Sequence, residues 1–475
     1  MEPSATEWRI EPAERFSVIV DAERYFRVAR RAMLDAKQRI MLVGWDFDAR
    51  IVLDHDCARD EGPRNVGEFI YWLVERNPDL EVYLLRWDVG ALRALFRGIT
   101  ILTVLKWMRH PRIHTKLDGH HPVGASHHQK VVVIDDCLAF CGGIDMTGDR
   151  WDTREHRDGD PGRVQPSGKP YKPWHDATTA VSGPVAAALG DMARERWQIA
   201  GGAALVPIAG AAPCWPEGLD VDFENIPVRI ARTIPEMAGQ ETAHECEALF
   251  LAQIAAARTC VYIESQYFAS RRIAEAIARR LDEPDGPEFI IVNPQTAQGW
   301  LEPVAMDSAR ARLVEALRRR DRHGRFRIYH PFTAKGAPIY VHAKILIADD
   351  RVLRLGSSNM NNRSLRLDTE CDLAIEAASA GDAARVAAIR DDLLAEHLGV
   401  PVERVGAAVA EKGLIGAVEA LRGAGRSLRP FEQPDLGAVE TWLADNEVLD
   451  PEGPGEMFEA LSTRGLFRRL RKPRG

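Results

Sequence analysis

Apolar and polar residues recur along this chain with two spacings, and the order of these spacings is the same in both halves. Residues 16–20 (FSVIV) and 228–232 (VRIAR) each predict a strand. A stretch with apolar residues at helical spacing follows each strand: AERYFRVARRAMLDAKQ in the first half and HECEALFLAQIAAART in the second. The repeat indicates that one structural unit occurs twice.

The repeat continues through most of the chain. RIMLVGWDFD and CVYIESQYF each predict a strand after the first helix, and GEFIYWLVERNPDLEVYLLRW and IAEAIARRLDEPDGPEFIIVNP each predict a further helix and strand. A last strand and amphipathic helix are predicted in PWHDATTAVSGPVAAALGDMARERW and LDTECDLAIEAASAGDAARVAAIRDDL. Strands that alternate with helices predict an α/β sandwich in each half.

Composition marks the boundaries between the predicted units. Gly, Ala and Pro dominate residues 200–218, which favours a linker there. We predict an N-terminal domain over 1–200, a linker over 201–218, a second domain over 219–400, and a small helical appendage with a basic tail over 401–475. The appendage is predicted from LGVPVERVGAAVAEKGLIGAVEALRG, and the tail ends in RGLFRRLRKPRG.

One short motif, H-x-K-x4-D-x6-G, occurs once in each half. The first copy contains His128, Lys130, Asp135 and Gly142, and the second contains His342, Lys344, Asp349 and Gly356. Residues two apart in a strand project from the same face, so each histidine is expected beside its lysine. An imidazole can attack an electrophile or move a proton, and an ammonium group beside it can hold an anionic oxygen.

The paired motif resembles the signature of the phospholipase D superfamily. The second copy continues GSSNMNNRSL, so Ser357 and Asn359 match the pattern of that family, whereas the first copy has Gly143 and Asp145 at these places. The resemblance implies two duplicated phospholipase D-like domains that form a pseudo-twofold, bilobal monomer. A carboxylate at Asp145 would repel phosphate unless it faces a lysine or a histidine.

The resemblance also implies one active site that combines both motifs. One histidine would attack phosphorus and the other would protonate the departing alcohol, with His128 as the expected nucleophile and His342 as the expected acid. Lys130, Lys344 and Asn359 would receive the charge of the transition state, so no metal and no cofactor is expected.

Each catalytic imidazole needs a partner on its second nitrogen to fix its tautomer. When WHDATTAV is aligned with DTECDLAI, Asp176 matches Glu370 at the start of the same predicted strand, and these two carboxylates are the candidates. Asp135 and Asp349 belong to the catalytic motif of the family. Their odd offset from the histidines places them on the opposite strand face, where we expect them to hold turns.

Three further segments, GWDFD, PWHD and ESQYF, resemble segments of eukaryotic-type phospholipases D. Their aromatic residues could line a head-group pocket, since the faces of Trp and Tyr attract quaternary ammonium groups. Core packing is an equal alternative for Trp45 and Phe47. A zinc site at His120, His121 and His127 is rejected, because no cysteine or carboxylate spacing supports it.

Composition narrows the class of protein. The net charge of −8 over 475 residues disfavours a dedicated nucleic-acid binder. The first residues lack the apolar core of a signal peptide and no apolar run approaches the length of a membrane span, so a cytoplasmic location is expected. The seven cysteines are scattered and odd in number, which predicts no disulfide framework, with Cys137 and Cys141 as buried thiols.

These features predict a phosphodiesterase that converts a glycerophospholipid such as phosphatidylcholine into phosphatidic acid, through a phosphohistidine, with transphosphatidylation. The alternatives are a cardiolipin synthase-like phosphatidyltransferase, a nuclease, and a catalytically silent lipid-binding module. The expected partner is phospholipid at the inner face of a membrane, with no nucleic acid. The basic tail from Arg464 is expected to assist docking on anionic lipid.

Overall fold

The computed structural model describes residues 5–58, 61–88, 103, 106–210, 214–297 and 306–434. The basic tail from Arg464 and the centre of the predicted insert before the first motif lie outside the described residues. Among the described helices, none is both long and apolar enough to cross a membrane.

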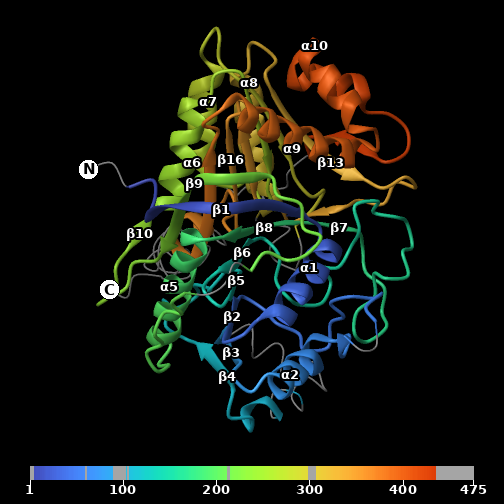
Figure 1. Ribbon diagram of the computed structural model, residues 1–475. Coiled ribbons are helices and arrows are strands. Elements are labelled where there is room, and N and C mark those ends of the chain that lie inside the picture. Colours follow the sequence, from blue (N-terminus) through green and yellow to red (C-terminus); the bar gives the residue numbers. More distant parts are fainter. Residues whose placement is uncertain are drawn as a thin grey trace, which may run out of the picture.

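One mixed sheet runs through both halves, and two long strands join it at the centre (Figure 1). β1 (Arg9–Val20) pairs antiparallel with β9 (Phe223–Ile234), with Phe16 opposite Phe223. Their outer neighbours are β8 (Ala177–Ser182) and β17 (Glu370–Glu376). The two domains therefore share a continuous sheet whose central strands are the first strand of each repeat.

From this centre outwards the strand order is the same in each half. It is β1-β8-β6-β5-β2-β3-β4 in the first half and β9-β17-β16-β15-β11-β12-β13 in the second. The remaining strands of the first half are β2 (Arg39–Gly44), β3 (Glu81–Trp87), β4 (Ile113–Asp118), β5 (Val131–Ile134) and β6 (Leu138–Gly142). Those of the second half are β10 (Ala243–His244), β11 (Cys260–Glu264), β12 (Glu288–Val292), β13 (Phe326–Phe332), β15 (Ile345–Ala348) and β16 (Val352–Gly356). The predicted duplicated, bilobal α/β fold is confirmed.

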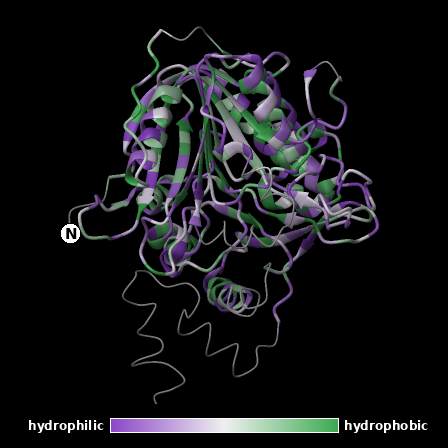
Figure 2. Cartoon of the chain, turned by 90° about the horizontal axis from the view of Figure 1, so that it is seen from below, coloured by the Kyte–Doolittle hydropathy of each residue, from purple (hydrophilic) through white to green (hydrophobic). Residues whose placement is uncertain are grey.

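Helices cover both faces of the sheet in each half. The helices of the first half are α1 (Ala22–Asp35), α2 (Val66–Arg76) and α5 (Pro184–Ile199). Those of the second are α6 (Glu245–Ala256), α7 (Arg271–Leu281), α8 (Ser308–Arg320) and α9 (Ala380–Leu398). Alternate strand residues face opposite layers: Leu42 packs with α1 and α2, whereas Met41 and Val43 pack with α5. Figure 2 shows the resulting hydrophobic interior between helices with polar outer faces.

The segment after residue 400 contains the predicted helix and one strand that the sequence pattern did not indicate. α10 (Val402–Leu421) lies against α9, and a left-handed residue at Gly413 (φ 73°) breaks it in two. β18 (Ser427–Pro430) then pairs antiparallel with β13. The appendage thus extends the sheet edge as well as covering a helix, and the pairing with β13 satisfies backbone groups of this short segment.

The prediction that Cys137 is a free buried thiol is wrong. Cys137, in the turn between β5 and β6, forms a disulfide with Cys214, with Cα atoms 6.1 Å apart. The bond spans 77 residues and fixes the segment before β9 to the first domain. Sequence spacing does not predict this contact, because it arises only when that segment folds back along the sheet. Cys141 is free and buried, as expected.

Candidate active site

Each motif histidine lies on a segment that pairs with the other half of the molecule. The backbone N–H of His128 donates to the carbonyl of Thr369 at 2.9 Å, and that of His342 donates to the carbonyl of His175 at 2.8 Å. β7 (Trp174–His175) and β14 (Tyr340–Val341) form a short parallel ladder directly before His342. The two motifs therefore meet at the interface between the domains.

The motif residues do not lie within the strands that the pattern predicts for them. β5 and β15 begin one residue after Lys130 and Lys344, respectively. The backbone leaves the central sheet at this point and pairs with the opposite domain instead. The motif residues before β5 and those before β15 come together in one site because each segment pairs with the opposite domain.

A carboxylate from the opposite domain faces the imidazole of each motif. Nδ1 of His128 lies 2.9 Å from Glu370, and Nδ1 of His342 lies 2.7 Å from Asp176. Both carboxylates are fully buried. The contacts fix the orientation of each ring and leave Nε2 as the nitrogen available for reaction. The structure thus brings together the two histidines and the two carboxylates that sequence alignment indicated.

Neighbouring polar groups hold these carboxylates in place. The hydroxyl of Ser357 donates to Glu370, and the backbone N–H of Ala177 donates to Asp176 at 2.9 Å. Ser357 therefore positions Glu370 and does not point at the reacting imidazole. The hydroxyl of Ser364, in the single-turn helix Arg363–Leu367, also hydrogen-bonds to Glu370.

The two lysines have different surroundings. Lys130 lies 3.1 Å from the carboxylate of Asp145 and donates to the carbonyl of His128 at 2.8 Å. Asp145, which departs from the family pattern, therefore neutralises Lys130. Lys344 donates to the carbonyl of His342, and within the described residues it has no carboxylate within ion-pair distance. The amide of Asn359 is buried and donates to Gln266 at 3.4 Å.

Burial favours the uncharged form of most of these groups. Burial and the charges of the two lysines lower the pKa of His128 well below its usual range. Burial and the charges of Lys344 and Arg150 lower the pKa of His342 in the same way. Burial also raises the pKa of Glu370 and of Asp176. Burial therefore disfavours both the imidazolium and the carboxylate ion in each pair.

Lys344 is the titrating cation of the site. Burial lowers its pKa from 10.5 to about 7, although the charge of Asp176 opposes this shift. A negatively charged ligand would restore the proton, because an opposite charge nearby favours the ammonium form. Binding of an anion would therefore favour the charged form of Lys344.

Asp135 and Asp349 lie at the far ends of the motif strands and do not reach the histidines. Each occupies a left-handed turn, with φ of 49° and 55° respectively. Asp135 accepts hydrogen bonds from the backbone N–H groups of Lys37, Gln38 and Arg39, and Asp349 accepts from those of Arg258, Thr259 and Cys260. As expected from their offset, they connect each turn to the start of the neighbouring strand, and a catalytic role for them stays a prediction.

The aromatic segments divide between the site and the core. Trp45 lies 6.4 Å from the ring of His128 and stacks on Trp87 at 5.9 Å. Trp174 lies 5.2 Å from the ring of His342 and stacks on Tyr340 at 4.6 Å. By contrast, Phe47 and Phe268 are buried in the domain cores. The tryptophans of GWDFD and PWHD therefore lie beside the motif histidines. In ESQYF, the hydroxyl of Tyr267 accepts a hydrogen bond from Gln266, which in turn accepts one from Asn359.

The three histidines before the first motif serve as separate structural contacts. His127 lies 3.1 Å from Asp118, which is also paired with Arg196. His121 lies 3.0 Å from Asp88, whereas His120 is exposed. The rings of His121 and His127 lie 5.3 Å apart, but each imidazole contacts a different carboxylate.

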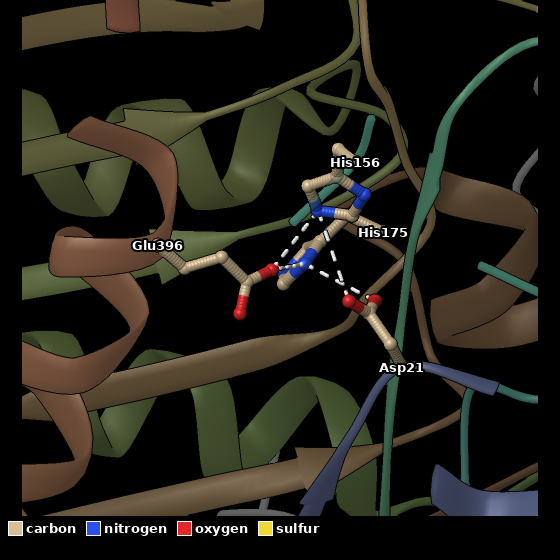
Figure 3. A group of neighbouring side chains, drawn as sticks. All are labelled: Asp21, His156, His175 and Glu396. Atoms are coloured by element: carbon tan, nitrogen blue, oxygen red, sulfur yellow. Dashed lines mark hydrogen bonds and ion pairs between the residues drawn. The ribbon is translucent and has the colours of Figure 1, made fainter. Parts of the chain in front are cut away.

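A second cluster of titratable groups, which sequence reasoning missed, lies behind Asp176. Figure 3 shows Asp21, His156, His175 and Glu396 pointing toward one another. The carboxylate of Glu396 lies 2.7 Å from Nδ1 of His175 and 3.0 Å from Nε2 of His156. The second nitrogen of each ring faces a further carboxylate, Glu264 at 2.7 Å from His175 and Asp152 at 3.0 Å from His156.

The buried carboxylates of this cluster determine the direction in which the pKa values of His156 and His175 shift. Burial alone would lower the pKa of His156, but its carboxylates outweigh burial and raise it to about 9. They raise the pKa of His175 as well, which favours the imidazolium form of both rings. The four facing donor atoms lie within 4.8 Å of one another, and nitrogen and carboxylate oxygen are also ligands of divalent cations. Two protons or one such cation would supply the same charge.

Comparisons with known proteins agree with this geometry. The Phospholipase D family profile matches residues 32–274, and the profile described as "Cardiolipin synthase, PLD-like domain" matches residues 250–389. A crystal structure of phosphatidylserine synthase from Haemophilus influenzae Rd KW20 has a similar fold, with a TM-score of 0.53 and 15% identity. That alignment covers 80% of this chain and 88% of the other.

Curated relatives carry the same family name. Phospholipase D A of Dictyostelium discoideum is 23% identical over 75% of this chain and 32% of its own length. Phospholipase D alpha 4 of Arabidopsis thaliana is 22% identical over 84% of this chain and 66% of its own length. The chain thus spans from about a third to about two thirds of these relatives. With a family profile over more than half of its length and both motifs at one interface, the chain belongs to the phospholipase D superfamily.

Proposed function

We propose that this protein is a phospholipase D-type phosphodiesterase that cleaves the bond between the phosphate and the head-group alcohol of a glycerophospholipid. The observation that carries the proposal is the pair of buried imidazole–carboxylate contacts, His128–Glu370 and His342–Asp176, which meet at one interface with two lysines. Both halves are needed for this site, because each imidazole takes its carboxylate from the other domain.

The chemistry proceeds in two displacements. Nε2 of His128 attacks phosphorus, the bond from phosphorus to the head-group oxygen breaks, and His342 gives that oxygen a proton. Water or another alcohol then loses a proton to His342 and attacks phosphorus, which breaks the phosphorus–nitrogen bond and frees His128. Splitting the reaction in this way avoids one difficult step. Lys344, Lys130 and the amide of Asn359 stabilise the charge on the equatorial oxygens.

The proton that His342 delivers is held by the His342–Asp176 pair. In the free site the pKa of His342 lies well below its usual range, because of burial and the nearby cations. A bound phosphodiester compensates that positive charge and raises the pKa of the imidazole. Substrate binding therefore generates the acid that the first displacement needs.

Transfer to an alcohol is the second candidate, with the same intermediate. The side chain of His128 is only 15% exposed, and that of His342 only 6%. A site with so little access to water favours an acceptor that enters with the lipid. The names of the matched cardiolipin synthase-like domain and of the phosphatidylserine synthase support transfer in the same direction.

A lipid panel tests the proposal. The purified full chain is incubated with vesicles of phosphatidylcholine, phosphatidylethanolamine, phosphatidylserine and phosphatidylglycerol, with and without ethanol, and with DNA in a separate reaction. Release of the head-group alcohol with phosphatidic acid supports hydrolysis, and phosphatidylethanol supports transfer. Cleavage of DNA with every lipid left intact would refute a phospholipid substrate. His128→Ala serves as the inactive control in each reaction.

A further inference from the structure

Arg150 is a buried guanidinium beside the active site. It follows β6 and a left-handed residue, Asp149 (φ 62°), and it is 9% exposed. Its Nη1 makes one long hydrogen bond, to the carbonyl of Asp149 at 3.4 Å, and its Nε is buried without a partner. Removing a charge from water without a counter-charge is unfavourable, so the position needs an explanation.

The other buried arginines of the described chain are compensated. Each has a carboxylate oxygen within 4.0 Å, and Arg150 does not. The compensated pairs are Arg30–Glu61, Arg163–Asp152, Arg194–Asp136, Arg196–Asp118, Arg232–Glu245, Arg310–Asp307, Arg354–Asp372 and Arg390–Asp391. Every other buried arginine of the described chain is therefore paired with a carboxylate. Arg150, the exception among the described residues, lies near His342.

The guanidinium of Arg150 lies over the face of an aromatic ring. It lies 4.3 Å from the ring centroid of Trp174, whose ring in turn lies 5.2 Å from that of His342. This cation–π contact holds the guanidinium near His342. The positive charge of Arg150 also acts on Lys344 and on Asp176. The free donors of this group therefore lie next to His342 and its partners.

The first motif lacks an anion-binding group that the second motif has. Asn359 of the second copy corresponds to Asp145 of the first, and Asp145 is bound to Lys130. Arg150 follows its motif histidine by 22 residues, and the matching residue in the second half is Ser364, which hydrogen-bonds to Glu370. A guanidinium thus stands on one side of the pseudo-twofold axis and a hydroxyl on the other.

We propose that Arg150 binds a non-bridging oxygen of the substrate phosphodiester beside His342 and replaces the donor that the first motif lacks. The inference rests on the proposed function for the identity of the substrate. Binding of an anion by this residue is a separate property of the site. A planar guanidinium can donate two parallel hydrogen bonds to phosphate, and it stays charged when Lys344 loses its proton.

The experiment compares Arg150→Gln and Arg150→Lys with the wild-type chain. The control is Arg9→Gln, because the guanidinium of Arg9 also lies on a tryptophan, 4.0 Å from Trp8, but outside the site. Binding of inorganic phosphate is measured by calorimetry, without turnover. We expect binding by Arg150→Gln to be about 10- to 100-fold weaker, because it loses a charge-assisted contact, with Arg150→Lys intermediate and Arg9→Gln unchanged.

Two further readouts separate ligand binding from a structural role. With a soluble p-nitrophenyl phosphodiester, Arg150→Gln should lower kcat/KM by about 100-fold or more, as the loss of one oxyanion donor does. Its melting temperature should equal or exceed that of the wild type, because an uncompensated charge is removed. A loss of melting temperature in both variants together with unchanged phosphate affinity would overturn the proposal and assign Arg150 to packing.

The outcomes also separate this inference from the proposed function. Phosphate binding that depends on Arg150, in a protein that cleaves no phospholipid, would support the anion site and refute the phospholipase activity. Equal phosphate affinity in wild type and Arg150→Gln, in a protein that cleaves phospholipid, would overturn the inference and leave the activity standing. A loss of activity confined to lipids with an anionic head group, with the soluble diester unaffected, would also overturn it, since Arg150 would then bind the head group.

Discussion

Glu370 lies 2.9 Å from Nδ1 of His128, although 242 residues separate them in the sequence. The mirrored contact, between Asp176 and His342, spans 166 residues in the opposite direction. Each domain thus supplies the imidazole of one pair and the carboxylate of the other. The proposed activity therefore depends on the domain interface.

Glu370→Gln should lower kcat by about 10³- to 10⁴-fold with little change in KM. The neutral amide keeps the shape of the side chain but no longer stabilises the positive charge that develops on His128 or fixes its tautomer. Steady-state kinetics on a soluble phosphodiester would measure the effect. Glu376→Gln, an exposed residue on the same strand β17, is the matched control. Activity within threefold of the wild type in Glu370→Gln would contradict the role of this contact.

The two motif histidines should respond differently to the leaving group. His128→Ala should abolish turnover of every substrate, because no phosphohistidine forms. His342→Ala should retain cleavage of a p-nitrophenyl ester, whose leaving group needs no proton, and should accumulate a phosphoryl adduct on His128. Mass spectrometry after brief exposure to the ester would locate the adduct. An adduct on any residue other than His128 would reverse the assignment.

The value of kcat/KM should fall as the pH rises above about 7. The free site holds Lys344 with a pKa of about 7, so its ammonium group is charged below this pH and neutral above it. We expect about a tenfold loss per pH unit on the alkaline side, because the anionic substrate then meets one cation fewer. In Lys344→Arg the guanidinium stays charged, and the alkaline limb should move to higher pH. An identical limb in both proteins would assign it to another group.

His156→Gln should destabilise the fold by about 3–5 kcal/mol at pH 6, because it leaves buried carboxylates without their cation. The pKa of His156 is about 9 in the folded chain and 6.5 when unperturbed. Its contribution is therefore complete below pH 6.5 and is lost as the pH rises to about 9. Denaturant unfolding at several pH values should show the difference from the wild type shrinking over this range. His323→Gln, which is exposed, is the control.

The occupancy of that cluster can be tested in the same experiment. If two protons balance its carboxylates, EDTA leaves the unfolding transition of the wild type unchanged. A lower melting temperature in EDTA, restored by a divalent cation, would contradict the protonated arrangement and show that His156, His175, Asp21 and Glu396 hold a metal ion.

Reduction of the Cys137–Cys214 disulfide should lower the free energy of unfolding by about 4 kcal/mol, the loop-closure value for a bond across 77 residues. The oxidised chain should release five thiols to Ellman's reagent under denaturing conditions, and the reduced chain seven. Cys214→Ser should melt like the reduced wild type, whereas Cys260→Ser keeps the bond and serves as the control. Seven thiols in the unreduced protein would show that the bond does not form.

The sequence predicted the local elements because their causes are local. Helices α1, α6 and α9 follow from the spacing of apolar residues, and the left-handed turns at Asp135 and Asp349 follow from paired aspartates between two apolar runs. Duplication adds a second source of information, since matching positions in the halves share a structural environment. The alignment that indicated Asp176 and Glu370 used this symmetry.

The tertiary structure decided which groups meet across the domains. Spacing within one strand does not reveal that His128 pairs with Thr369, that Asp145 faces Lys130, or that Cys214 returns to Cys137. Arg150, His156 and Glu396 carry no local signal, because a charged residue in a loop or helix is ordinarily solvated. Their chemistry arises from burial and from partners on the other domain. The sequence by itself therefore determined the repeated fold and its motif histidines, while packing at the interface determined their burial and their partners.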